Sequence, residues 1–442
     1  MIRFPSSVTV LVTAIFSLTL NAAELPMASA EQEGMSSERL QLVDEMNHRF
    51  TDSGKIAGTV TAVVRNGKIV HQSKAGVKGS NDPRPIEMDD LFRIYSMTKP
   101  ITAAAAMQLY EQGKFQLTDP VSKFIPELKG LNVYKDGELV PVSREMTMQQ
   151  LLSHTAGFSY GFDPSNPVDQ MYRDADLWSA RDLDEFVARL AKLPLMFEPG
   201  ERWHYSVAVD VTGLVVQRLS GQPFDEYLAE HIFEPLDMYD TSFSVPPNKS
   251  DRFLPNHILD RESGKPVEFR EEEASEIGPT ALFRSCSAMC NFETVTLFSG
   301  GGGLVSTLRD YVRFAEAMRT GSLGDVRILG PKTVQYMRKN HLPASIAATG
   351  TSGEQINLGA GDIGGTGFGL GFGVVTDTAA QGVMGSPGQY FWGGAAGTVF
   401  WIDPVEDLVV VSMMQLMNGW SNYRPELRVA TYQAITEPKE QD

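Results

Sequence analysis

The stretch TVTAVVRNGKIVHQ, residues 59–72, has the pattern of two β-strands joined by a tight turn. Both halves are rich in Val, Ile and Thr, which favour strands, and Asn66-Gly67 between them accepts the positive φ angles of a two-residue hairpin loop. The stretch GTVFWIDPVEDLVVVSMMQL, residues 397–416, has the same plan around a turn centred on Pro404. Each end of the chain is therefore predicted to contribute an antiparallel hairpin.

A helix is predicted beside each hairpin. The segment 36–50 carries four apolar residues at the spacing of one helical face: Leu40, Val43, Met46 and Phe50. The segment PELRVATYQAI, residues 425–435, closes the chain as a second helix. This pattern predicts an α+β fold in which one antiparallel sheet, assembled from both ends of the chain, is flanked by terminal helices.

The middle of the chain is predicted to be an inserted, mainly helical lobe. Three segments there have helical patterns and are separated by polar loops: TMQQLLS (147–153), DLDEFVARLAK (182–192) and VAVDVTGLVVQRLS (207–220). The predicted organisation is an α/β lobe formed by residues 24–120 and 295–442, with the helical lobe at 121–294 between its two parts.

Composition argues against several classes of function. A chain of 442 residues with 42% hydrophobic and 21% charged residues is typical of a globular protein with room for two lobes. Its net charge of -17 repels phosphate backbones, so nucleic-acid binding is not expected. The seven His include no HExxH motif, and the cysteines form no paired CxxC pattern, so no metal site is expected.

The N-terminus resembles a cleaved export signal. Arg3 precedes an apolar run from Val8 to Leu20, and the small residues Ala22 and Ala23 follow it. The run is too short to span a bilayer comfortably, and the alternative is a buried N-terminal helix. Removal of residues 1–23 would give an exported protein, periplasmic or secreted, without an integral membrane span.

The only two cysteines, Cys286 and Cys290, stand four residues apart in SCSAMC. An exported protein permits a disulfide, but a regular helix at this spacing would hold the two Cβ atoms too far apart. Two free thiols, or a loop bridge without catalytic importance, is the favoured interpretation.

The segment RIYSMTKP, residues 93–100, contains the only S-x-x-K motif in the chain. Pro100 fits the first turn of a helix, and ITAAAAMQLYEQ then supplies strong helix formers up to Gly113. Ser96 is therefore predicted at a helix N-terminus, with Lys99 on the same face and within reach of its hydroxyl. This arrangement suits a nucleophile with its proton acceptor, but the motif alone does not decide the matter.

Two other motif matches lack the structural context that they need. GFSYG, residues 157–161, fits the G-x-S-x-G pattern, but a helical segment precedes Ser159 and no helix follows it, whereas the elbow needs a strand and then a helix. GAGDIG, residues 359–364, fits a dinucleotide motif, yet more glycine and a strand follow it. We interpret the second as a flexible loop, and no cofactor is expected.

A serine nucleophile needs a base, and a tyrosine is the second candidate for that role. Lys and Tyr ordinarily hold their protons to about pH 10, but a buried Lys beside a Tyr can share one charge with it. Tyr205 follows a Pro-Gly turn in EPGERWHYSVAVDV and stands just before a predicted helix.

Three motifs in order resemble those of the serine β-lactamase and penicillin-binding-protein superfamily, and specifically its esterase branch, the family VIII carboxylesterases. They are Ser96 to Lys99, Tyr205-Ser206-Val207, and Trp392-Gly393-Gly394 in YFWGGAAGT. Supporting stretches such as LLSHTAGF, SGGGGLVST and FWIDP extend the resemblance over residues 36 to 435. It implies a β-lactamase-like fold.

The resemblance implies an acyl-enzyme route. Ser96 would attack a carbonyl, Lys99 and Tyr205 would handle its proton, and water would later release the acyl group. The backbone N–H groups of Ser96 and Ala395 would hold the oxyanion. Which of Lys99 and Tyr205 is the primary base is left open. The resemblance also implies that His154 supports the site, and the glycines 300–303 are expected to allow close packing or substrate approach.

Two departures from the lactamase pattern bear on the substrate. Val207 stands where lactamases usually have Asn, and Trp392 where they usually have Lys or His. The site then lacks an amide for a substrate amide and a cation for a substrate carboxylate, so a neutral, short-chain ester is the expected substrate. Trp392, Gly393, Gly394 and Val207 are the predicted substrate-binding residues beside Ala395. The alternatives are a β-lactamase or D-alanyl peptidase, an acyltransferase, and a penicillin-binding receptor without turnover. The oligomeric state is not predicted.

Overall fold

A computed structural model of the chain describes residues 24–260, 262–269, 291–343, 346, 364–417 and 422–439. The predicted signal segment 1–23, Cys286, Cys290 and residues 359–363 of the glycine-rich motif lie outside the described residues.

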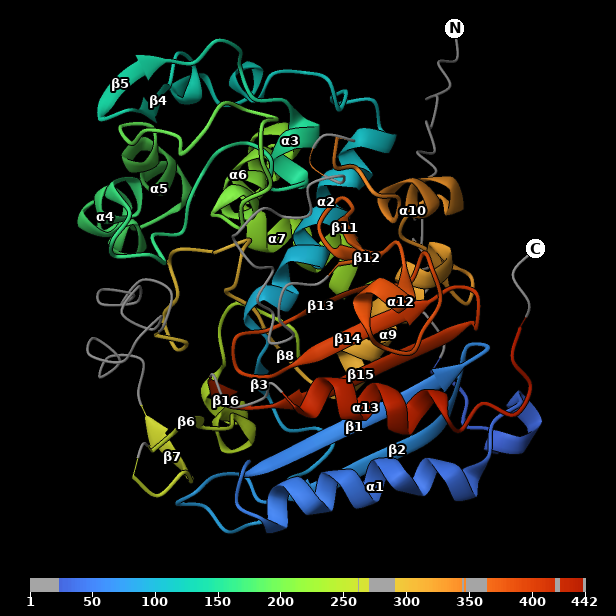
Figure 1. Cartoon of the computed structure of the whole chain (residues 1–442). Coiled ribbons are helices and arrows are strands. Elements are labelled where there is room, and N and C mark those ends of the chain that lie inside the picture. The colour runs from blue at the N-terminus through green and yellow to red at the C-terminus, as the bar shows by residue number, and fades with distance from the viewer. Residues whose placement is uncertain are drawn as a thin grey trace, which may run out of the picture.

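The described part of the chain contains a seven-stranded antiparallel sheet in the order β11-β12-β13-β14-β15-β1-β2 (Figure 1). Its strands are β1 (Gly58–Arg65), β2 (Lys68–Gly76), β11 (Thr366–Phe368), β12 (Gly373–Val375), β13 (Tyr390–Gly393), β14 (Val399–Asp403) and β15 (Leu408–Met414). Strand β1 pairs with β15 from Thr59 opposite Met414 to Arg65 opposite Leu408. The prediction that both ends of the chain build one antiparallel sheet is confirmed.

Both predicted hairpins are present, and their turns have the expected chemistry. Arg65 pairs with Lys68, so Asn66 and Gly67 form the loop, with φ angles of 53° and 77°. These angles suit the two-residue turn that matches the twist of paired strands. In the second hairpin the Asp403 carboxylate closes the turn by accepting the backbone N–H of Val405 at 3.1 Å.

Helices cover both faces of the sheet. The terminal helices α1 (Ser37–Asp52) and α13 (Tyr423–Tyr432) share one apolar cluster, in which the rings of Phe50 and Tyr423 meet edge-on at 5.3 Å. Helix α9 (Leu308–Thr320) packs on the opposite face against β14 and β15. Figure 1 shows α13 in front of the strands and α9 behind them. The terminal helices flank the sheet as predicted, both on one face, and the internal helix α9 covers the other.

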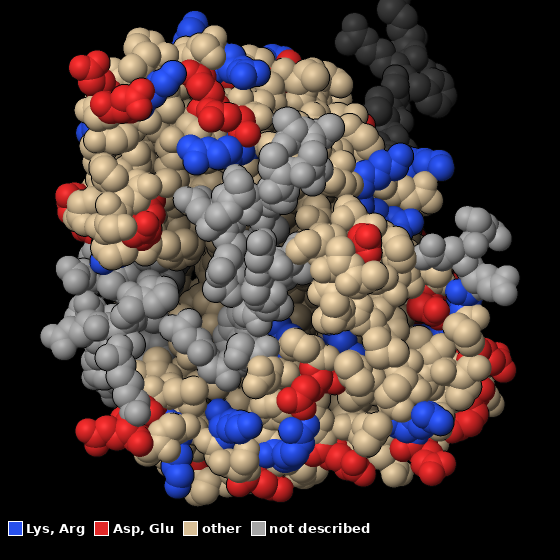
Figure 2. Space-filling model, viewed as in Figure 1, with Lys and Arg blue, Asp and Glu red and all other residues tan. Residues whose placement is uncertain are grey.

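The outer side of α1 is polar, as its sequence pattern requires. Its four predicted apolar residues are buried, while charged side chains of both signs lie along the edge formed by α1 (Figure 2). The helix therefore stabilises the fold through one apolar stripe and meets solvent with the other.

The middle of the chain supplies most of the remaining helices. They are α2 (Thr98–Glu111), α3 (Met148–Leu152), α4 (Pro167–Asp174), α5 (Leu183–Leu190), α6 (Ala208–Ser220) and α7 (Phe224–Leu228), with α10 (Pro331–Met337) and α12 (Thr378–Gln381) further along the chain. Short 3₁₀ turns lie at Ala30–Glu33, Tyr95–Met97 (η2), Val121–Lys123, Pro126–Leu128, Leu177–Ser179 and Pro247–Arg252, and a π turn lies at Ala229–Phe233. Helices α2 and α6 pack against each other, and both lead into the candidate site.

Small strand pairs join the segments. They are β3 (Phe92–Arg93) with β8 (Val305–Ser306), β4 (Asn132–Lys135) with β5 (Glu138–Pro141), β9 (Ser322–Leu323) with β10 (Val326–Arg327), and β6 (Asn256–Leu259) with both β7 (Pro266–Phe269) and β16 (Leu416–Met417). The middle segment thus contains strands as well as helices, and the parallel pairing of β6 with β16 ties it to the end of the sheet.

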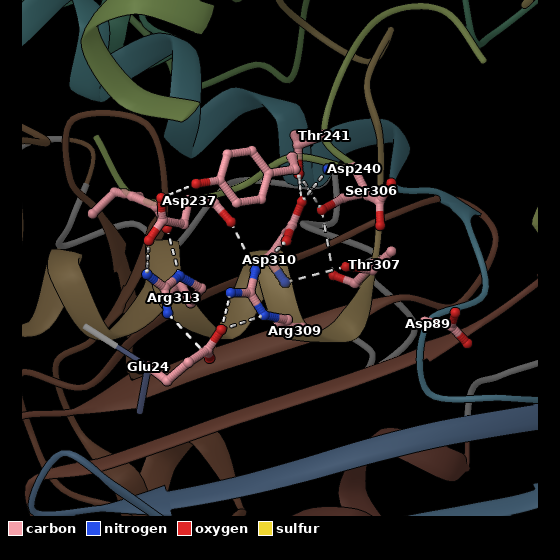
Figure 3. Close-up of polar contacts among 12 residues, drawn as sticks. Glu24, Asp89, Asp237, Asp240, Thr241, Ser306, Thr307, Arg309, Asp310 and Arg313 are labelled. Carbon is pink, nitrogen blue, oxygen red and sulfur yellow. Dashed lines mark hydrogen bonds and ion pairs between the residues drawn. The ribbon is translucent and has the colours of Figure 1, made fainter. Parts of the chain in front are cut away.

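The first described residue is anchored to the body of the protein (Figure 3). The Glu24 carboxylate pairs with Arg309 and lies 3.3 Å from Nη1 of Arg313, both on α9. Arg313 is itself buried and also bonds Asp237 at 3.2 Å.

None of the helices in the described part of the chain has the length and apolar character that a membrane crossing requires.

Candidate active site

Ser96 lies in η2, the 3₁₀ turn that leads directly into α2. The preceding Tyr95 has a φ of 42°, a conformation that is uncommon outside glycine and stores strain. Its phenolic oxygen accepts a hydrogen bond from Asn256 Nδ2 at 2.8 Å, which helps to hold the turn. The serine thus stands on a sharp, fixed turn at a helix entrance.

The structure brings the three predicted catalytic side chains together at one oxygen. The Tyr205 hydroxyl donates to Ser96 Oγ at 2.6 Å, and Lys99 Nζ lies 3.2 Å from the same atom. Tyr205 comes from the loop before α6, so the packing of α2 on α6 sets this geometry. A hydroxyl in contact with two titratable groups has the arrangement of an activated nucleophile.

Lys99 has the electrostatic character of a base. Its side chain is fully buried, and burial lowers its pKa to about 7, although the Asp210 carboxylate favours the charged form. Nζ also donates to the Gly301 carbonyl oxygen at 2.6 Å. A substantial share of the amine is therefore neutral near pH 7 and able to take a proton.

Tyr205 remains protonated near neutrality. Burial raises the pKa of its hydroxyl well above the ordinary value, and the hydrogen bond to Ser96 opposes this only in part. Its ring lies 4.5 Å from Lys99 Nζ, a contact that favours the charged amine. Near pH 7 Tyr205 therefore holds its proton, whereas a share of Lys99 is neutral and able to accept one, although both groups contact Ser96.

Asp210, which the sequence analysis did not single out, supports the amine from α6. It is buried, accepts the Gly301 N–H at 3.0 Å and is bonded by the Ser299 hydroxyl. Burial raises the pKa of the Asp210 carboxyl, and the charge of Lys99 opposes the rise. A carboxylate inside the apolar helical run VAVDVTGLVV is the signal in the sequence by which it could have been found.

The expected close packing is found at Gly300, Gly301 and Gly303, but not at Gly302, where the nearest atom to a Cβ would be 3.8 Å away. A Cβ at Gly301 would lie 2.4 Å from Asp210 Oδ2, and one at Gly300 would lie 2.7 Å from the Val209 carbonyl oxygen. A side chain at Gly301 would therefore displace the carboxylate whose charge acts on the amine.

The third predicted motif lies beside the nucleophile turn. Trp392, on β13, is buried, and its ring centroid is 5.6 Å from that of Tyr205 and 5.2 Å from that of Phe368. A Cβ at Gly394 would lie 2.5 Å from the Ile94 carbonyl oxygen, two residues before Ser96. The half-buried Ala395 follows in the same turn.

The surroundings of these groups are mainly aromatic and apolar. Val207 is 1% exposed and its N–H donates to the Ser159 carbonyl at 3.3 Å. The half-exposed Phe162 stacks on Tyr160 at 5.1 Å and lies nearly parallel to the Tyr205 ring at 6.4 Å. Within the described residues, no group of three or more potential ligands could hold a metal ion.

Ser159 and His154 have partners of a different kind. The Ser159 hydroxyl donates to the Asp169 carboxylate and accepts the Gly161 N–H at 2.9 Å, so its described hydrogen bonds are made with neither Lys99 nor Tyr205. His154 is buried, which holds its pKa well below the ordinary value, and its Nδ1 accepts the Ser206 N–H at 3.3 Å. The imidazole thereby braces the segment that carries Tyr205.

The chain resembles known proteins over most of its length. The family model described as Beta-lactamase matches residues 39–433. The chain is 34% identical over 373 residues to Protein Rv1367c of Mycobacterium tuberculosis, covering 82% of this chain and 87% of the relative. It is 32% identical over 367 residues to Esterase EstB of Burkholderia gladioli, covering 81% and 85%.

A solved structure has the same fold. EstCE1, described as a hydrolase with promiscuous acyltransferase activity, superposes with a TM-score of 0.72 at 25% identity, over 89% of this chain and 99% of that one. The predicted β-lactamase-like fold is confirmed.

Proposed function

Because this chain belongs to the serine β-lactamase and penicillin-binding-protein superfamily, in its esterase branch, we propose that it hydrolyses neutral, short-chain carboxylic esters through an acyl-enzyme on Ser96. Membership of this family identifies the protein as a β-lactamase-fold hydrolase. The ester substrate is what we propose in addition. The observation that carries the proposal is the meeting of Lys99 and Tyr205 at Ser96 Oγ.

In the proposed first step, neutral Lys99 takes the proton of Ser96 as Oγ attacks the ester carbonyl. The lowered pKa of the amine and its 3.2 Å distance from Oγ support this assignment of the base. Tyr205 then gives its phenolic proton to the departing alkoxide and regains one from the Lys99 ammonium. An alcohol leaves, and the acyl group remains on Ser96.

In the second step the same groups act on water. Lys99, neutral again, accepts a proton by way of Tyr205 as water attacks the acyl carbonyl, and the proton returns to Ser96 Oγ when the acid departs. The N–H groups of Ser96 and Ala395 are the proposed oxyanion donors in both steps. One such donor is typically worth a factor of about 10² to 10³ in kcat.

The lining of the site favours an ester over a β-lactam. Val207 and Trp392 are both buried and apolar, and they stand where an amide and a cation would bind a β-lactam or a D-alanyl peptide. Because this site has neither the amide nor the cation, a neutral acyl group that contacts aromatic rings should bind better than a β-lactam. A small-molecule ester is thus the proposed partner.

Acyl transfer is the second candidate, because EstCE1 is described as a hydrolase with promiscuous acyltransferase activity. An acyl-enzyme that excludes water would pass its acyl group to an alcohol by the same steps. The test is turnover of a panel of chromogenic esters, amides and β-lactams, each with and without an added alcohol. Ester turnover with free acid as product supports hydrolysis, ester product supports transfer, and a single acylation without turnover would leave only a penicillin-binding receptor.

We also propose that residues 1–23 are removed and that the chain is exported, to the periplasm or the medium. The charge and apolar pattern of the N-terminus supports this.

A further inference from the structure

The terminal helix α13 reaches the turn that follows β13 through one side chain. Arg424, half-buried, donates from Nη2 to the carbonyl oxygens of Gly394 at 3.0 Å and Thr398 at 2.8 Å. Hydrogen bonds from a charged guanidinium are stronger than those between neutral groups. One cation therefore holds two carbonyls four residues apart.

Those two carbonyls are the ones that close the turn around Ala395. The Gly394 N–H donates to the Thr398 carbonyl at 2.8 Å, and the Gly397 N–H donates to the Gly394 carbonyl at 3.1 Å. Ala395 lies between these bonds. Loss of the hydrogen bonds from Arg424 would therefore change the orientation of the Ala395 backbone.

The same turn is packed against the segment that carries the nucleophile. The Thr398 hydroxyl donates to the Ile94 carbonyl at 3.4 Å, and this carbonyl also accepts the Met97 N–H at 3.0 Å, which closes the turn around Ser96. A Cβ at Gly394 would lie 2.5 Å from the same carbonyl oxygen, so only glycine allows this approach of the two turns. The distance between the two proposed oxyanion donors is thus set where these two turns meet.

The contact with Gly394 has an electronic consequence as well. The Gly394 carbonyl and the Ala395 N–H belong to one peptide group, so a cation on the oxygen draws electron density from the amide and strengthens its N–H as a donor. The sequence makes room for this contact at Gly393, where a Cβ would lie 2.4 Å from Arg424 Nη2.

We propose that Arg424 is a positioning residue of this active site, which orients and polarises the Gly394–Ala395 peptide so that the Ala395 N–H stabilises the oxyanion. The inference rests on the proposed esterase function. It gives the terminal helix α13 a role in positioning the active site, in addition to covering the sheet.

The test compares Arg424→Met with Arg424→Lys in the full-length protein. For Arg424→Met we expect kcat on nitrophenyl butyrate to fall by about 10- to 100-fold, less than for a donor lost outright because the Ala395 N–H remains, with KM nearly unchanged. The affinity of a boronic acid that forms a tetrahedral adduct with Ser96 should fall in proportion. Arg424→Lys keeps the charge and should recover most of both losses, because its ammonium is able to bind one carbonyl.

Arg428→Met is the matched control. Arg428 lies on α13 one turn further along and is buried, and its guanidinium stacks over the rings of Phe391 at 5.3 Å and Trp401 at 4.9 Å. We expect this variant to lose thermal stability but to keep kcat and boronate affinity, as a purely structural role would.

The outcomes separate the two proposals. A wild-type protein that does not turn over nitrophenyl butyrate overturns the proposed function and this inference with it. An active wild type whose Arg424→Met variant resembles Arg428→Met, less stable but equal in kcat and boronate affinity, overturns this inference alone. Should Arg424→Met fail to fold, Arg424→Gln, which also removes the charge, is measured in its place. A fall in kcat at nearly constant KM, followed by a fall in boronate affinity, supports the inference, and wild-type values for both overturn it.

Discussion

Lys99 Nζ lies closer to the carbonyl oxygen of Gly301, at 2.6 Å, than to Ser96 Oγ, at 3.2 Å. The amine is thus held by a backbone acceptor that cannot itself take a proton. When Lys99 is neutral, one of its hydrogens can stay on Gly301 while its lone pair is available to Ser96. The Gly301 N–H in turn binds Asp210, so one glycine connects the base to the carboxylate whose charge acts on it.

The first prediction concerns pH. Because burial lowers the pKa of Lys99 to about 7 and the neutral amine is the proposed base, kcat/KM should rise as pH increases through about 7 and then level off. Asp210 favours the charged amine, so Asp210→Asn should move the rise to lower pH. The measurement is kcat/KM on nitrophenyl butyrate from pH 5 to 9, corrected for spontaneous hydrolysis. A rise that moves to higher pH in Asp210→Asn contradicts the assignment.

The second prediction concerns stability. The pKa of Lys99 is lowered from 10.5 to about 7, so below pH 7 the folded protein must bury a charge that the unfolded chain keeps in water. Lys99→Met should therefore be more stable than the wild type at pH 6, by at most about 5 kcal/mol for a shift of this size. The unfolded chain binds the extra proton between about pH 7 and 10.5, so this advantage should shrink as the pH rises through that window. Urea unfolding at pH 6 and pH 9 measures it, and an equal or larger advantage at pH 9 would be inconsistent with a buried, neutral Lys99.

The third prediction compares the two rival serines. Ser96→Ala should abolish ester turnover, because it removes the atom on which Lys99 and Tyr205 meet. Ser159→Ala should keep most of the activity, but it should lose about 1 to 3 kcal/mol of stability because it removes a hydrogen bond from the buried Asp169. Activity and thermal unfolding of both variants test this, and the reverse pattern of activity would remove Ser96 from the proposed mechanism.

The fourth prediction concerns the mature N-terminus. The sequence pattern places removal of the signal between about residues 22 and 31. The ion pairs of Glu24 with Arg309 and Arg313, and the bond from the Ala28 N–H to Ile69, favour the start of that range, since later removal would delete them. Intact mass of exported protein should show a start at residues 22 to 24. Retention of Met1 in that fraction would exclude cleavage.

What the sequence predicted well was encoded locally. Asn66-Gly67 specifies its own turn, and the spacing of Leu40 to Phe50 specifies the buried face of α1. The nucleophile, its lysine and the tyrosine were found through motifs, and the structure places all three in contact.

What the sequence did not predict depends on contacts between distant segments. Asp210 and Gly301 are 91 positions apart, and no local sequence pattern predicts that they are in contact. The hydrogen bond from Arg424 to Gly394 likewise depends on how α13 packs on the sheet. The sequence predicts Ser96 at a helix N-terminus. It lies just before the helix, in a 3₁₀ turn that begins at the strained Tyr95.

The last prediction concerns the choice of substrate. A β-lactam meets Trp392 where a lactamase has a cation and Val207 where it has an amide, so it loses one charged and one neutral hydrogen bond. These are worth roughly 1.5 to 3 and about 1 kcal/mol, which together amount to about two to three decades in kcat/KM at 1.4 kcal/mol per decade. Nitrophenyl butyrate loses neither bond, and its nitrophenolate leaving group needs little protonation by Tyr205. We therefore expect ready turnover of nitrophenyl acetate and butyrate, slow turnover of nitrocefin and none of peptides ending in D-alanine. Both chromogenic substrates should be measured on one preparation, with Ser96→Ala as the common blank; a higher kcat/KM for nitrocefin would contradict the esterase assignment and leave only a β-lactamase-fold hydrolase.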